Sequence, residues 1–219
     1  ADPASWPART HASAAGAIVA RVDNVAKAFG PRTLFAGVSA DIRQGEIVAI
    51  TGESGAGKTT FGNLLLGLLR PDAGTVTRAA GLPRTAFQKL YQDPAAAFAP
   101  TASVETALRD VVKLHGLAWD SVPPLLARLR LGEHLLARLP SQVSGGELQR
   151  FALARVLLLK PALIFADEPT SRLDPITQQE TLSLLLDTAS ASGCAVLLVT
   201  HDADIARAVA QRRINLHAG

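Results

Sequence analysis

The chain has 219 residues, of which 48% are hydrophobic, and its 22 basic and 19 acidic side chains give a formal net charge of +3. This length allows one large α/β domain or a core with a small subdomain, and the spread of basic residues gives no reason to expect nucleic-acid binding. The single cysteine excludes an intramolecular disulfide and a cysteine zinc cluster. The sequence has no uncharged apolar run of the roughly 18 residues that a membrane-spanning helix needs.

The start of the chain has an unusual composition. Residues 1–16 are rich in Ala, Pro and Ser, and we expect a linker or the remnant of a tag there. The sequence contains no methionine and begins with Ala1. We therefore expect that a native start was removed or that the chain was excised from a longer polypeptide, with the folded domain at residues 17–219.

The first part of this domain is predicted to be rich in strands. Residues 18–22 are expected to form a strand and the polar residues 23–30 a turn. Residues 38–42 alternate in the manner of an antiparallel strand, whereas residues 47–50 form an apolar run that is typical of a buried strand. A glycine-rich loop follows, and after it a helix that should end near Leu69.

The glycine-rich loop matches the pattern G-x-x-x-x-G-K-[ST] between a predicted strand and a predicted helix. Glycines let the backbone approach phosphate oxygens, and the loop N–H groups then point into one concavity at the positive end of a helix dipole. Lys58 supplies a positive charge for the β- and γ-phosphates, and the Thr59 hydroxyl is suited to Mg²⁺. The predicted phosphate site comprises Gly52, Glu53, Ser54, Gly55, Ala56, Gly57, Lys58, Thr59 and Thr60.

The middle of the chain changes from strands to helices. Residues 75–77 and 87–91 are predicted to be short strands. Between about residues 93 and 143 the apolar spacing becomes helical and rich in leucine. This predicts a helical subdomain at 93–143, inserted into a core made of about residues 17–92 and 144–219.

In the last third, apolar strands alternate with helices, which predicts a mostly parallel sheet that is covered on both faces. Ligands of such sheets bind at the carboxyl ends of the strands, and Asp167, Glu168 and His201 directly follow two of them. Asp167 is placed to hold Mg²⁺ opposite Thr59, and Glu168 is the candidate general base for an attacking water. The helices are expected at residues 146–159, 175–188 and 202–210, and the strands at 162–166, 194–199 and 213–216.

Together, the glycine-rich loop, the acidic pair Asp167 and Glu168, and His201 resemble motifs of the nucleotide-binding domain of ATP-binding cassette (ABC) transporters. The resemblance covers about residues 18–217, and the motifs occur in the family order. The most family-specific stretch is residues 144–150, which resemble the ABC signature. Val143 and Glu147 stand where Leu and Gln are commoner in the family. In the family this motif binds the γ-phosphate of an ATP held by the opposite subunit, so the resemblance implies a head-to-tail dimer. The residues that would contact this second ATP are Ser144, Gly145, Gly146 and Glu147.

Other positions match family loops by their order along the chain. Gln92 falls at the Q-loop and Asp174 in the D-loop, while His201 matches the H-loop residue that contacts the γ-phosphate and holds Glu168 and water. Phe29 lies where the family stacks an aromatic ring on adenine, although a core side chain is the alternative interpretation of this position. The implied catalytic residues are Lys58, Gln92, Glu168 and His201, and the implied Mg²⁺ ligands are Thr59, Gln92 and Asp167.

The resemblance implies an α/β fold with a P-loop NTPase core, a mostly parallel sheet, an antiparallel β subdomain and an inserted helical subdomain. It implies an ATP- and Mg²⁺-dependent ATPase that couples energy to transport as a peripheral protein on the cytoplasmic face of the inner membrane. The expected partners are a second ABC ATPase subunit, identical or not, transmembrane permease subunits and a solute-binding protein, but no nucleic acid. The context of Gln92 resembles the oligopeptide, dipeptide and nickel importer branch.

Two other functions remain open from the sequence. One is a non-transport ABC ATPase that acts on nucleic acid or ribosomes, although the chain lacks the long coiled-coil insertion and the cysteine zinc modules of some such relatives. The other is a degenerate cassette that binds ATP only as a structural element. The presence of Lys58, Asp167, Glu168 and His201 argues against this second alternative.

Overall fold

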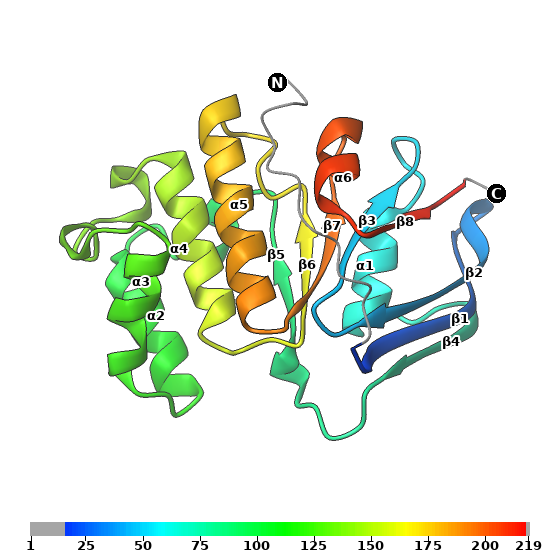
Figure 1. The fold of residues 1–219 in the computed structure, drawn as a ribbon, viewed down its shortest axis with the longest axis horizontal. Coiled ribbons are helices and arrows are strands. Elements are labelled where there is room, and N and C mark those ends of the chain that lie inside the picture. The colour runs from blue at the N-terminus through cyan, green and yellow to red at the C-terminus, as the bar shows by residue number, and fades with distance from the viewer. Residues whose placement is uncertain (1–15, 218–219) are drawn as a thin grey trace.

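The computed structural model describes residues 16–217, so the predicted linker lies almost entirely outside the described residues. The described chain contains two sheets and several helices, with an antiparallel sheet at one end of the molecule and a group of helices at the other (Figure 1). Between them lies a five-stranded parallel sheet. The predicted fold class is therefore confirmed.

The antiparallel sheet has the order β2-β1-β4 and consists of β1 (Ile18–Phe29), β2 (Arg32–Arg43) and β4 (Ala73–Arg78). The predicted turn at residues 23–30 is wrong, because β1 continues to Phe29. The pairing of β1 shifts its register around Asn24, which has a φ of 50°. This irregularity accommodates the polar residues that suggested a turn.

The parallel sheet has the order β5-β6-β7-β3-β8. Its side chains alternate between two hydrophobic clusters: Leu163 and Phe165 of β6 point to one face, and Ile164 and Ala166 to the other. Both faces are therefore buried, which explains why these strands read as continuous apolar runs. The five strands are β3 (Ile47–Thr51), β5 (Phe87–Leu90), β6 (Leu163–Asp167), β7 (Ala195–Val199) and β8 (Arg212–Asn215).

Helix α1 (Lys58–Leu66) packs on the same face as the antiparallel sheet through Phe61, Leu64 and Leu65. It ends three residues before the predicted Leu69, because Gly67 takes a left-handed conformation with a φ of 76° and caps the helix. The other face is covered by α4 (Gly145–Leu157), α5 (Pro175–Ala191) and α6 (Ala203–Val209).

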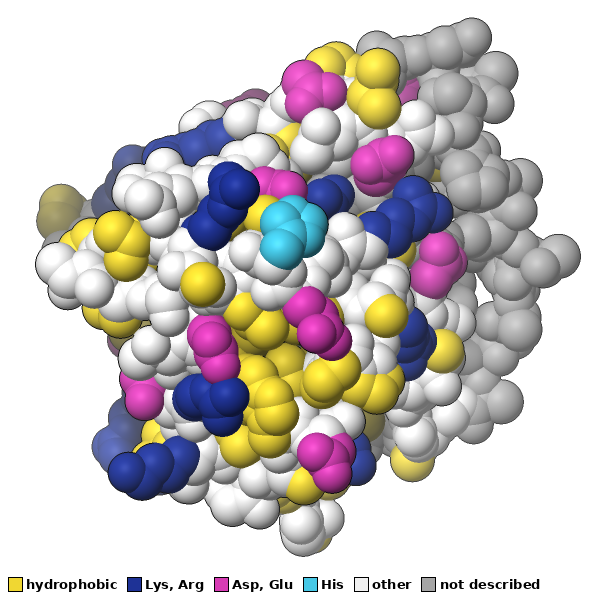
Figure 2. Space-filling model, turned by 90° about the vertical axis from the view of Figure 1, so that its left-hand side faces the viewer, with side chains coloured by type: hydrophobic (Ala, Val, Ile, Leu, Met, Phe, Trp, Pro, Cys, Tyr) yellow, Lys and Arg dark blue, Asp and Glu magenta, His cyan; other side chains and the backbone are white. Residues whose placement is uncertain are grey.

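The segment between β5 and α4 contains α2 (Val104–Leu114), α3 (Val122–Arg128) and several short 3-10 turns. Its buried residues join the same hydrophobic cluster as α4 and α5, so this block shares a core with one face of the parallel sheet. Figure 2 looks onto this end of the molecule, where hydrophobic side chains gather among acidic and basic ones. The subdomain boundaries at residues 93 and 143 stay a prediction.

Among the helices between residues 16 and 217, none combines the length and the apolar character that crossing a bilayer requires.

Cys194 is 1% exposed just before β7, and burial raises the pKa of its thiol to about 12. It therefore behaves as a small buried hydrophobic residue, as predicted.

Candidate active site

The predicted phosphate loop connects β3 to α1 with a backbone that only glycine adopts easily. Gly52 and Gly57 have φ angles of 145° and 86°. A Cβ atom at Gly52 would lie 2.4 Å from the carbonyl oxygen of Leu216, and one at Gly57 would lie 3.0 Å from Leu34 and from the ring of Phe35. Conformation and space thus require glycine at these two positions, and the loop stays open for a ligand to approach its backbone.

Lys58 is the first residue of α1 and lies over this loop. Its ammonium group donates hydrogen bonds to the carbonyl oxygens of Gly52 and Glu53, each at 2.9 Å. The side chain is 7% exposed, so its position is well defined. Ala56 is buried, and its N–H donates a hydrogen bond to the Glu53 carbonyl oxygen at 3.1 Å. This bond closes a turn within the loop.

A cavity of about 350 Å³ opens above the loop. Phe29 lines it and is 54% exposed, so the interpretation of Phe29 as a core side chain is wrong. The hairpin that carries Phe29 is anchored to the loop, because Arg32 donates a hydrogen bond to the Gly55 carbonyl oxygen at 3.2 Å. The cavity is lined by Phe29, Leu34, Ser54, Gly55, Gly57, Lys58, Thr59, Thr60, Glu168, Val199 and His201.

Two predicted Mg²⁺ ligands are in direct contact. The Thr59 hydroxyl donates a hydrogen bond to Oδ1 of Asp167 at 3.1 Å, and the Lys89 ammonium lies 3.2 Å from Oδ2. Among residues 16–217, no three or more His, Cys, Asp and Glu side chains form a group that could hold a metal ion. The hydroxyl of Thr59 and the carboxylate of Asp167 lie side by side, and oxygen ligands of this kind fit a Mg²⁺ ion that takes its remaining ligands from phosphate and water.

Glu168 sits where two other predicted residues meet. Its Oε1 lies 2.6 Å from Nε2 of His201, and its Oε2 accepts a hydrogen bond from the Gln92 amide at 3.3 Å. The same amide donates to the Ser171 hydroxyl at 3.0 Å. Glu168 has a φ of 49°, an uncommon backbone conformation, and its N–H donates to the Val199 carbonyl oxygen at 3.1 Å. The carboxylate is thereby oriented on both sides at the edge of the cavity.

The signature segment forms the N-terminus of α4. Ser144 caps this helix by accepting a hydrogen bond from the Glu147 N–H at 3.2 Å, and the Glu147 carboxylate accepts one from the Ser144 N–H at 2.8 Å. That bond from the backbone of Ser144 holds the pKa of Glu147 below its usual value. A Cβ at Gly146 would lie 2.4 Å from the Thr177 side chain, so this glycine is also needed for packing against α5.

The signature and the phosphate loop are not brought together within one chain. For the described residues, the lining of the cavity above the loop includes none of Ser144, Gly145, Gly146 and Glu147. This arrangement is compatible with the predicted role toward a second subunit, which stays a prediction.

Asp174 is the N-cap of α5 and accepts hydrogen bonds from the N–H groups of Ile176 and Thr177 at 3.2 and 3.1 Å. Hydrogen bonds from Thr177 lower the pKa of this carboxyl from its ordinary value. Nearby, Arg172 forms an ion pair with Asp93 at 2.8 Å. The D-loop is thereby tied to the segment that follows Gln92.

The sequence analysis did not identify four contacts of this site: Arg32 with Gly55, Lys89 with Asn63, Lys89 with Asp167, and Ser171 with Gln92. Arg32 contacts the loop, and Ser171 of the D-loop contacts Gln92, because the chain folds back, so no local pattern marks these two contacts. Lys89 had a local signal, because a lysine within a predicted strand of a sheet that is covered on both faces needs a polar partner. That partner is Asp167 of the neighbouring strand β6.

The parallel sheet, the glycine loop at the carboxyl end of β3 and the acidic pair at the end of β6 define a P-loop NTPase of the ATP-binding cassette type. The ABC transporter family matches residues 35–171, and the chain belongs to this family.

Three relatives show the range of transport functions found at this level of similarity. A Brucella ovis protein named for peptide import is 32% identical over 198 residues, covering 83% of this chain and 62% of its own length. The nickel import ATP-binding protein NikE of Brucella abortus is 36% identical over 206 residues, covering 86% of this chain and 77% of its own. An aliphatic sulfonates import ATP-binding protein of Rhodococcus jostii is 38% identical over 198 residues, covering 90% and 71%.

A solved structure matches the fold as a whole. The dimeric, post-hydrolysis structure of an ATP-binding cassette bound to ADP and Pi superimposes with a TM-score of 0.73 at 28% identity. The match covers 90% of this chain and 94% of that one. The chain spans about three fifths of the length of the peptide import relative, at 62%.

Proposed function

We propose that this chain is the ATP-hydrolysing, energy-coupling subunit of an ABC transporter. The observation that carries the proposal is the position of Glu168, held by His201 and Gln92 at the edge of the cavity that contains Lys58. A carboxylate oriented beside a phosphate-binding loop is suited to position water for attack on a phosphoryl group.

The proposed ATP site follows the cavity lining. The adenine would stack on the exposed ring of Phe29, and the loop N–H groups with Lys58 would hold the phosphates. Thr59, Asp167 and Gln92 would hold Mg²⁺, which neutralises phosphate charge when it is bound.

The chemical step depends on positioning and charge. Glu168 would accept a proton from the attacking water, while His201 and Gln92 keep its two oxygens in place. Because Gln92 follows β5 and precedes the helical block, any movement of that block would change its hydrogen bond to Glu168. We therefore propose that residues 93–143 act as a subdomain that transmits movement to the catalytic carboxylate.

A phosphate-release assay tests the enzymatic part of the proposal. The unmodified chain should release phosphate from Mg-ATP, and Glu168→Gln should lower kcat by about 100-fold or more while ATP still binds. Lys58→Ala should weaken ATP binding itself. Glu133→Gln changes an exposed carboxylate in the helical block and should behave like the unmodified chain. Full turnover by Glu168→Gln would refute the assignment of the base.

The second proposed component is another cassette subunit. The signature N-terminus of α4 presents Ser144 and Gly145 at an exposed helix end, and a dimer is seen in the related ADP-bound structure. Mg-ATP held in one chain would bind to this helix N-terminus of the other. Light scattering of Glu168→Gln with Mg-ATP should show twice the monomer mass, and the double variant with Ser144→Arg should remain monomeric. A dimer that forms equally in both variants would argue against the signature contact.

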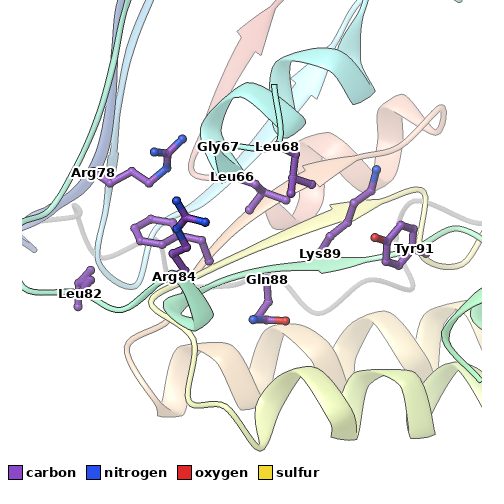
Figure 3. A pocket seen from close by; sticks show the side chains of 10 residues that line it. Leu66, Gly67, Leu68, Arg78, Leu82, Arg84, Gln88, Lys89 and Tyr91 are labelled. Atoms are coloured by element: carbon purple, nitrogen blue, oxygen red, sulfur yellow. The ribbon is translucent and has the colours of Figure 1, made fainter. Parts of the chain in front are cut away.

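We propose that a membrane subunit docks on the surface formed by the end of α1, β4 and β5. A cavity of about 520 Å³ lies there between the end of α1, β4 and β5, and Figure 3 shows Leu66 and Leu68 above Lys89 and Tyr91. Leu68 and Tyr91 are exposed large hydrophobic residues, and Tyr91 directly precedes Gln92. A partner helix in this cavity would therefore contact the segment that leads to the catalytic carboxylate.

The proposed partner is the cytoplasmic loop of a transmembrane permease, which places the chain on the cytoplasmic face of the inner membrane. Co-purification tests this contact: Leu68→Arg with Leu82→Arg, two residues that line the cavity, should release the permease and leave ATP binding unchanged, whereas retention would refute it. The three relatives are named for import of peptides, nickel and sulfonates, so we propose an importer of the peptide and nickel type, working with a solute-binding protein. None of these relatives favours the nucleic-acid alternative.

A further inference from the structure

Lys89 is a partly buried cation beside the proposed metal site. It lies in β5, and its side chain is 11% exposed next to Asp167, which is 13% exposed. The Lys89 ammonium is 3.2 Å from Oδ2 of Asp167 and also donates a hydrogen bond to Oδ1 of Asn63 at 3.2 Å. The loop-and-strand motifs do not account for this residue.

The ammonium is held in place by its other neighbours as well. Its nitrogen lies 5.1 Å from the ring centre of Tyr91 and 5.2 Å from that of Phe165. Two aromatic rings and two polar partners together fix the position of the charge. Because only 11% of the Lys89 side chain and 13% of the Asp167 side chain are exposed, the field of this charge is screened less than that of a surface lysine.

The two oxygens of Asp167 therefore have different partners. Oδ1 accepts the hydrogen bond of Thr59, and Oδ2 faces Lys89. We propose that Lys89 is a positioning residue that turns Oδ1 of Asp167 toward Thr59 and, through its fixed positive charge, weakens the binding of Mg²⁺ to the nucleotide site. This inference rests on the proposed function, because it assigns Asp167 to the metal.

The two effects of Lys89 act in opposite directions, and their sizes decide the expected result. Fixing one carboxylate rotamer favours metal binding by a factor of a few. Repulsion between a partly buried ammonium and a divalent cation that share one carboxylate disfavours binding by on the order of tenfold to a hundredfold. Repulsion is the larger effect, so removal of the charge should tighten metal binding.

The test measures metal affinity directly, with Mn²⁺ as the probe and its electron paramagnetic resonance signal as the readout, in the presence of saturating ATP. Lys89→Met keeps the length of the side chain but removes the charge, and it should bind Mn²⁺ on the order of tenfold more tightly than the unmodified chain. Lys89→Arg keeps the charge, and with it the repulsion, and should stay within about threefold of the unmodified affinity. Lys113→Met removes an exposed lysine of α2 and should have no effect.

ATP binding in EDTA separates this inference from the proposed function. If the unmodified chain binds ATP but Lys89→Met has equal or weaker Mn²⁺ affinity, the role of Lys89 is overturned. If the unmodified chain binds no ATP with or without metal, the proposed function itself is overturned. Lys89→Gln, which can still hydrogen-bond to Asn63, should also bind Mn²⁺ more tightly, and it provides the measurement if Lys89→Met does not fold.

Discussion

Gly57→Ala tests whether the phosphate loop depends on the backbone that the structure shows. Gly57 has a φ of 86°, and a non-glycine residue in this left-handed region costs about 1 kcal/mol. The added Cβ would also lie 3.0 Å from Leu34 and from the buried ring of Phe35, and overpacking of this kind adds about 1 kcal/mol. We therefore expect the free energy of unfolding to fall by about 2 kcal/mol, or Tm by about 4–8 °C.

Gly81→Ala is the matched control. Gly81 has a similar φ of 80°, but a Cβ there would meet no atom within 4 Å. This variant should lose only the conformational part, about 1 kcal/mol. The difference between the two variants, measured by urea unfolding, isolates the packing of the loop against Leu34 and Phe35.

Nucleotide affinity is measured on the same two proteins with a fluorescent ATP analogue. Gly57→Ala should weaken binding by tenfold or more, because the shifted loop can no longer direct its N–H groups to the phosphates. Gly81→Ala should bind as the unmodified chain does. Equal losses of stability in the two variants, or ATP affinity of Gly57→Ala within twofold of the unmodified value, would refute the reasoning.

Three further predictions use other parts of the chain. Glu147→Gln should lower the free energy of unfolding by less than about 1 kcal/mol at pH 7. Because the fold lowers the pKa of Glu147 from its ordinary value of 4.5, the difference from the unmodified chain should shrink below pH 4.5 and vanish below the lowered pKa. Urea titrations measure this difference, and a difference that does not depend on pH would contradict the prediction. His201→Ala should lower kcat at least tenfold with unchanged ATP affinity, since it removes the partner of Glu168, and equal kcat values would count against that contact. Cys194, with its pKa of about 12, should not react with a thiol reagent at pH 8 until urea unfolds the chain, and rapid labelling of the native protein would show that it is accessible.

Most of the fold was predictable because the parallel strands are buried on both faces and their apolar runs are unambiguous. The helix ends were less predictable: α1 stops at Leu66 because Gly67 caps it, and α5 continues to Ala191, three residues beyond the expected end. The antiparallel sheet was the least predictable part. Its strand β1 contains polar residues that lie on an exposed face, and a single sequence does not distinguish them from a turn.

Some residues of the candidate site could be predicted from the sequence and others could not. Residues that follow a strand directly, such as Glu168 and His201, could be predicted because parallel strands deliver their carboxyl ends to one edge. Distant contacts could be predicted only where both residues belong to motifs, as for Thr59 with Asp167. The pairs of Gln92 with Ser171 and of Arg172 with Asp93, each 79 positions apart, could not be predicted. Such pairs depend on the tertiary fold and leave no local pattern.

The central claim is geometric: one cavity brings the phosphate loop, Glu168 and His201 around the same phosphate, with Asp167 hydrogen-bonded to Thr59 of the loop. A structure of Glu168→Gln with Mg-ATP, which slows hydrolysis, tests this claim most directly. The account predicts the triphosphate in the loop of residues 52–60, with the γ-phosphate next to residue 168 and His201. Nucleotide bound elsewhere, for example in the cavity of Figure 3, with the loop unchanged, would contradict it.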